Sequence, residues 1–119
     1  MKSTLARAAA SVLAIIAAAA QAGAADVLSD FVGYTVIASK TIDSFADRGK
    51  EKKDGFEGCD HDRVIIFTDG TAVTCRTYSY TYSYRPTAVI LGQQVNYQGK
   101  QLTLLKMVVG DTAYDITGR

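Results

Sequence analysis

The chain has few of the side chains that most often carry chemistry. Its 119 residues include one histidine, two cysteines and one proline. A closed zinc site needs four ligands, so the histidine and cysteines do not complete one unless carboxylates join them. Nucleophile-elbow, P-loop, dinucleotide-binding, HExxH and EF-hand motifs are also absent. We therefore do not expect an enzyme, and no cofactor is implied.

Charge of either sign is not in excess. The chain carries 13 Lys and Arg residues against 12 Asp and Glu residues. Without Lys2 and Arg7, which belong to a predicted signal peptide (the leader), 11 basic residues remain against 12 acidic ones, a net charge of −1. A near-neutral surface argues against nucleic acid and against an anionic membrane as partner. After the leader, no segment is long and apolar enough to span a bilayer.

The first 25 residues have the pattern of a signal peptide. Lys2 and Arg7 form a positive start, residues 8–20 are mostly apolar, and residues 22–25 supply small residues for cleavage. Removal of this segment leaves a single predicted domain, residues 26–119. A short, alanine-rich signal is typical of bacteria, so we predict a periplasmic protein, with secretion to the outside as the alternative.

Both cysteines fall in the exported part, which predicts a Cys59–Cys75 disulfide. Free thiols or a metal-binding pair are the alternatives. A separation of 16 residues would stabilise the fold by about 3 kcal/mol in the chain-entropy model. A continuous strand would place Cys59 too far from Cys75 for a bond, so the chain must leave the ladder before Arg63. Gly58 and the segment 60–62 suit such a break.

Two hairpins are predicted from their turns. Asp69-Gly70 is a strong two-residue turn signal. It would set Ile66 opposite Val73 and Val64 opposite Cys75 on the core face.

The second turn, Gly110-Asp111, would set Lys106 opposite Asp115 and Met107 opposite Tyr114. Polar pairs then share one face and apolar pairs share the other, and this agreement supports the register.

Other strands are predicted near 32–39, at 88–91 and at 102–109, with Gly92-Gln93-Gln94 as an interruption and Gln98-Gly99 as a turn. The charged segment 43–58 reads as a long mobile loop, with Phe45 and Phe56 anchoring its two ends in the core. No helix of ordinary length is evident after the leader. The sequence thus predicts an all-β fold, a small antiparallel barrel or roll of five to six strands. It is similar to SH3-like barrels in size and order only, and a two-layer sandwich is the alternative.

The most distinctive segment is TYSYTYSY, residues 77–84. On an extended chain its four tyrosines, Tyr78, Tyr80, Tyr82 and Tyr84, point to one side. They form either a second packed face or an aromatic stripe in solvent. An exposed stripe, with Arg85 at its end, would suit binding to a protein or a cell-wall component.

One further segment, Asp60-His61-Asp62, pairs a histidine with carboxylates that suit metal binding or proton transfer. Because alternate residues point to opposite sides, His61 would face away from both aspartates. A charged turn with a solvated histidine, its aspartates neutralising Arg63, is the simpler interpretation. A non-catalytic binding module is therefore the leading hypothesis. A structural envelope protein without a ligand and a small hydrolase or metal-dependent enzyme at His61 are the alternatives.

Overall fold

The computed structural model describes residues 28–119, so the signal peptide predicted for residues 1–25 lies outside the described residues. The chain divides into two units, with the boundary in sequence between Gly33 and Tyr34. In the first, the amide of Phe31 donates a hydrogen bond to the carbonyl of Leu28 within a short turn. The second, Tyr34–Arg119, contains every strand of the described residues. Within residues 28–119, no helix has the length and apolar character that crossing a membrane requires.

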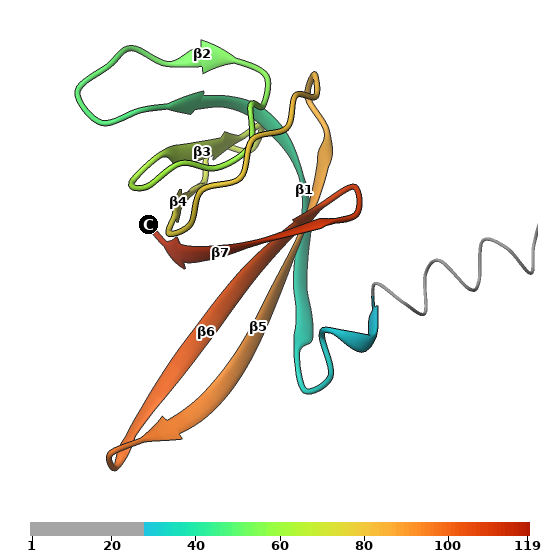
Figure 1. Cartoon of the computed structure of the whole chain (residues 1–119), viewed down its shortest axis with the longest axis vertical. Helices are drawn as coiled ribbons and strands as arrows, with labels where there is room; N and C mark the ends of the chain where they lie inside the picture. Colours follow the sequence, from blue (N-terminus) through green and yellow to red (C-terminus); the bar gives the residue numbers. More distant parts are fainter. Residues whose placement is uncertain (1–27) are drawn as a thin grey trace, which may run out of the picture. The chain divides into compact units, whose positions relative to one another are not determined.

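Seven antiparallel strands make up the second unit (Figure 1). They are β1 (Thr35–Ala46), β2 (Lys53–Asp54), β3 (Val64–Phe67), β4 (Ala72–Cys75), β5 (Thr87–Tyr97), β6 (Lys100–Val109) and β7 (Thr112–Gly118). Six of them close into a barrel in the order β1-β3-β4-β7-β6-β5 and back to β1, and β2 is an extra strand on β1. The predicted all-β class and the small antiparallel barrel are confirmed.

Strand β1 closes the barrel because its two halves pair with different neighbours. Its first half, Thr35 to Thr41, pairs with β5, and its second half, from Ile42 to Ala46, pairs with β3. The predicted strand near 32–39 was therefore placed too early. Gly33, with a φ of +87°, adopts the left-handed conformation just before β1 begins.

The segment 43–58 is more ordered than the loop predicted for it. Its first residues continue β1, and Lys53–Asp54 form β2 on the edge of that strand. The charged connection between these two strands, which belongs to no strand itself, is therefore only residues 47–52. Phe45 and Phe56 are both buried, which confirms that they anchor this segment in the core.

The β3–β4 hairpin differs from the prediction by one residue. Val73 lies opposite Ile65 rather than Ile66, because the turn contains three residues, 68–70, instead of two. Gly70 has a φ of +85°, and the amide of Phe67 donates to the carbonyl of Thr71. A type I turn followed by a left-handed glycine accounts for this geometry. The buried face of β3 is consequently Ile65 and Phe67, and the predicted core positions Val64 and Ile66 are only half-buried.

The β6–β7 hairpin has the predicted register. Lys106 lies opposite Asp115, with 2.8 Å between Nζ and Oδ1, and Met107 lies opposite Tyr114. Gly110 has a φ of +61° while Asp111 does not have a positive φ, the combination found in a type II′ turn.

Strand β5 is continuous, which corrects the interruption predicted at residues 92–94. Gly92 pairs with both Thr35 and Leu105, and a Cβ there would come within 2.4 Å of the Cδ1 of Ile37. The glycine thus leaves room for the side chain of Ile37 on β1 rather than ending the strand. The turn at Gln98-Gly99 is confirmed, and both residues have positive φ.

The core fills the barrel between the inward faces of these strands. Fourteen buried residues form one cluster, and they are Ile42, Phe45, Phe56, Cys59, Ile65, Phe67, Val73, Cys75, Ala88, Ile90, Met107, Val109, Tyr114 and Ile116. The cluster includes the disulfide and reaches the segment 56–59, which supports the tyrosines discussed next.

Candidate binding surface

Four of the seven tyrosines occupy alternate positions in residues 77–84, a segment that bends at Thr77 and Tyr84 and forms isolated bridges at Ser79 and Ser83. Each is between 64% and 67% exposed, whereas the hydroxyl residues between them at 79, 81 and 83 are half-buried. The alternation predicted from the sequence is therefore present, and it turns the aromatic rings to solvent. We call these four side chains, Tyr78, Tyr80, Tyr82 and Tyr84, the tyrosine surface.

The segment beneath the tyrosine surface is held by backbone pairing, although it is not a regular strand. Ser83 exchanges amide–carbonyl hydrogen bonds with Phe56, and Ser79 exchanges them with Cys59, with N–O distances of 2.9–3.0 Å. Between these two pairs Gly58 has a φ of +79°. The alternation suggested an extended chain here, but only two isolated bridges form, because the facing segment 56–59 is itself irregular.

Gly58 is the point of closest approach between the two segments. A Cβ on it would lie 2.1 Å from the carbonyl oxygen of Ser79 and 2.8 Å from the amide nitrogen of Thr81. Both atoms belong to the backbone, so no side-chain rotation can relieve the overlap. Only glycine lets the tyrosine segment lie this close to residues 56–59.

Replacing this glycine, as Gly58→Ala, should lower the free energy of unfolding by about 2 kcal/mol or more, through backbone strain and overpacking. Gly70→Ala is the matched control, because Gly70 also has positive φ but has open space around it. The control should cost only the conformational term of about 1 kcal/mol. Equilibrium urea unfolding measures both, and an equal cost for the two variants would contradict the close packing at residue 58.

Two buried anchors connect the segment 56–59 to the barrel. The predicted disulfide is confirmed and joins Cys59 to Cys75 at the end of β4. The ring of Phe56 packs edge-on against the ring of Tyr114 on β7, with 5.7 Å between centroids. Covalent and aromatic contacts thus hold the support of the tyrosine surface in place. As predicted, the chain turns at residues 60–63 to bring the two cysteines together.

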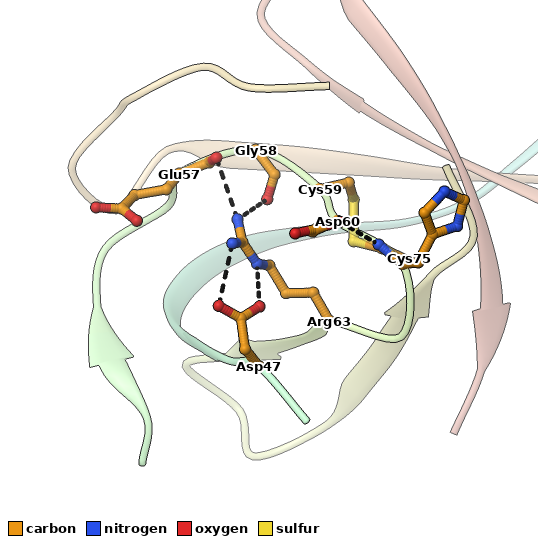
Figure 2. Close-up of a disulfide and its surroundings, with 8 residues drawn as sticks. Asp47, Glu57, Gly58, Cys59, Asp60, Arg63 and Cys75 are labelled. Carbon is orange, nitrogen blue, oxygen red and sulfur yellow. Dashed lines mark hydrogen bonds and ion pairs between the residues drawn. A yellow bond between two sulfur atoms is a disulfide. The ribbon is translucent and has the colours of Figure 1, made fainter. Parts of the chain in front are cut away.

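A third anchor is the buried guanidinium of Arg63 (Figure 2). Its Nε and Nη2 donate to the two carboxylate oxygens of Asp47, at 2.6 and 3.2 Å. Its Nη1 donates to the carbonyls of Glu57 and Gly58, each at 3.2 Å. The guanidinium also lies 4.6 Å from the ring centroid of Phe45. One side chain therefore joins the end of β1 to the segment that supports the tyrosine surface.

The partner of Arg63 was not predicted correctly. The sequence suggested that Asp60 and Asp62 would neutralise it, but Asp47 does so from a position 16 residues earlier. The pKa of the Asp47 carboxyl lies below its usual value of 3.8, mainly because Arg63 donates hydrogen bonds to it. No sequence signal connects the two residues, since the contact depends on how β1 and the 56–63 segment meet.

Arg85 lies at the end of the tyrosine surface, as its position in sequence implies. Its Nη2 is 3.4 Å from Oδ1 of Asp43, and its guanidinium is 5.7 Å from the ring centroid of Tyr84. The backbone of Arg85 has a φ of +47°, where the chain turns before Pro86 and β5. The arginine is thus partly neutralised by Asp43, although it remains accessible.

The Asp60-His61-Asp62 segment forms an exposed turn. The carboxylate of Asp60 accepts a hydrogen bond from the backbone amide of His61 at 2.8 Å. Asp62 has a φ of +64° and lies 3.8 Å from Arg48, an exposed pair. Among residues 28–119, no group of three or more histidine, cysteine or acidic side chains is arranged to hold a metal ion. The weak metal candidates Asp60, His61 and Asp62 therefore gain no third ligand from the described part of the chain.

Known proteins offer no guide to the role of this surface. No protein-family model, curated protein or solved structure matches the chain. The chemistry of the tyrosine surface and its surroundings is therefore the basis on which a function is inferred.

Proposed function

We propose that the chain is an exported, non-catalytic binding module that contacts a protein or a cell-wall component through the tyrosine surface. The observation that carries this proposal is the exposure of all four tyrosines, each about two-thirds accessible to solvent. Tyrosine offers a large amphipathic contact area and loses little conformational entropy on binding. Arg85 at the end of the row adds a charged contact.

The rigidity of the support strengthens the proposal. Backbone pairing, the disulfide and Arg63 hold the segment that carries the rings, so its backbone is already in place before a partner arrives. Such preorganisation reduces the entropic cost of binding. Exposed aromatic side chains lower the solubility of a protein that has no partner for them. Their presence on the surface therefore also favours a binding role.

Export to the periplasm belongs to the same proposal, with secretion as the alternative. A structural disulfide is typical of proteins that fold in an oxidising compartment. The alternatives of a ligand-free envelope protein and of an enzyme at His61 have no specific observation in their favour.

The proposal is tested with the oxidised domain, a Tyr80→Thr/Tyr82→Thr variant and a Tyr97→Thr control. Tyr97 is 61% exposed but lies on β5, away in sequence from the tyrosine surface. Because the three side chains are exposed, all proteins should melt at similar temperatures and share one circular dichroism spectrum. We expect a partner from envelope extract to be retained by the parent and the control and lost by the double variant. Equal retention by the folded double variant would contradict the proposal.

A further inference from the structure

A groove opens where β6 and β7 separate, next to the start of the tyrosine segment. The two strands pair from Val109 and Thr112 as far as Leu105 and Ile116. Beyond that point β7 pairs with β4 on its other edge, while β6 continues with β5 alone (Figure 1). The open groove left between them has a volume of about 520 Å³.

The groove carries a net positive charge. Lys106 on β6 and Asp115 on β7 form an ion pair of 2.8 Å, so their charges balance. Arg76 lies beside them, because its backbone amide donates to the carbonyl of Asp115 at 2.9 Å. The side chain of Arg76 is exposed and has no ion-pair partner among residues 28–119. An arginine that lines a groove and has no ion-pair partner is suited to a carboxylate, which a guanidinium binds in a planar, bidentate manner.

The same groove is continuous in sequence with the tyrosine surface. Thr77 lines it, and Tyr78, the first tyrosine of the row, is the next residue. Consecutive Cα atoms are about 3.8 Å apart, so Arg76 and Tyr78 are within about 7 Å of each other along the backbone. A ligand that lies on the rings can therefore extend to the guanidinium.

The tyrosine surface and the groove together form a linear binding surface suited to a polymer. The tyrosines follow one another every second residue, so successive tyrosine Cα atoms are at most about 7 Å apart, and the segment 77–84 contains no charged residue. Sugar rings have apolar faces that pack on aromatic rings and hydroxyl groups that bond to tyrosine hydroxyls. Thr77 and Thr117, two hydroxyl residues, also line the groove.

We infer that the tyrosine surface and the Arg76 groove together bind a polysaccharide that carries carboxylate groups, with the rings of Tyr78 to Tyr84 packing on sugars and Arg76 pairing with a carboxylate. This inference rests on the proposed function and names the chemical class of its ligand. An acidic peptide is the competing occupant, since it offers carboxylates without sugar rings.

Affinity electrophoresis of the oxidised protein tests the inference with three soluble polymers. Polygalacturonate carries the carboxylates on sugar rings, its methyl ester keeps the rings without the charge, and poly-L-glutamate keeps the charge without the rings. Retardation by polygalacturonate is expected, with weak retardation by the other two. No binding of polygalacturonate, or equal binding of poly-L-glutamate, would overturn the inference, the second result in favour of an acidic peptide.

Variants then separate the groove from the tyrosine surface. Arg76→Gln should weaken binding of polygalacturonate about tenfold, the value of one charge-assisted hydrogen-bonded pair. Arg48→Gln removes the same charge from an exposed site outside the groove and should have little effect. Tyr80→Thr/Tyr82→Thr should also weaken binding. If either Arg76→Gln or the tyrosine variant binds polygalacturonate as well as the parent does, the inference that Arg76 and the tyrosines form one shared site is wrong.

The outcome is distinguishable from failure of the proposed function. If polygalacturonate does not bind but envelope extract still yields a partner that depends on Tyr80 and Tyr82, the binding surface stands and only the ligand class is wrong. If the extract partner does not depend on those tyrosines, the proposed function itself fails.

Discussion

Replacing both cysteines, as Cys59→Ala with Cys75→Ala, is expected to lower the free energy of unfolding by about 3 kcal/mol. The bond closes a loop between residues separated by 16 positions, and its loss returns conformational freedom to the unfolded chain. Both cysteines are also buried in the core, so their truncation removes packing as well. A domain of this size has limited stability from burial alone, which makes the loss a large fraction of the total.

The same variant should also lose the order of the tyrosine segment. Cys59 exchanges two backbone hydrogen bonds with Ser79, so release of the disulfide loosens one of the two pairs that hold the segment. Equilibrium urea unfolding, compared with the oxidised parent and with the parent in reductant, measures the stability. Hydrogen exchange at residues 79–83 measures the local effect. A change below about 1 kcal/mol would contradict the structural role assigned to this disulfide.

The second large effect is expected at Arg63, where Arg63→Met should cost about 3 kcal/mol or more. The substitution leaves the carboxylate of Asp47 and the carbonyls of Glu57 and Gly58 without their donors. Groups that lose a buried charged partner keep their desolvation cost but lose the compensating interaction. Arg63→Lys should recover only part of the stability, because an ammonium does not reproduce the two-pronged contact with Asp47.

The stability that Arg63 contributes should depend on pH in a defined direction. The folded state lowers the pKa of Asp47 below 3.8, so this contribution is present above about pH 4 and is lost as the pH falls through the folded-state pKa. The difference in unfolding free energy between the parent and Arg63→Met should therefore be larger at pH 7 than at pH 3.

Urea unfolding at both pH values checks this expectation, with Arg48→Met as the control. Arg48 is 86% exposed and follows Asp47 directly, so its replacement should change the stability by less than about 0.5 kcal/mol. A stability difference for Arg63→Met that is the same at pH 3 and pH 7 would show that Asp47 is not the partner that matters.

Local turn chemistry explains which parts of the fold were predictable. The Gly110-Asp111 hairpin was correct in every pair named, because a two-residue turn and the apolar pattern of both strands agree on one register. The Asp69-Gly70 hairpin was wrong by one residue, because the same dipeptide also suits a three-residue turn with Gly70 as the left-handed residue. Both flanking strands have apolar residues on each face, so the pattern did not choose between these registers.

The candidate site was predictable in composition but not in exposure. The alternation of tyrosine and hydroxyl residues is visible in the sequence, and it places the four rings on one side. Whether that side faced the core or the solvent depended on how the segment docks against residues 56–59, through the bridges at Ser79 and Ser83 and the close approach at Gly58.

The all-β class, the disulfide, the β6–β7 register and the one-sidedness of the tyrosines could thus be predicted from the amino acids, because these features depend on backbone conformational preferences and on residues that are close in the chain. Three other features became visible only in the folded chain: the tyrosines are exposed, Arg63 pairs with Asp47, and Gly92 lies within β5 beside Ile37. These features depend on contacts between segments far apart in sequence. The free energy of such a contact depends on how all the neighbouring segments pack around it.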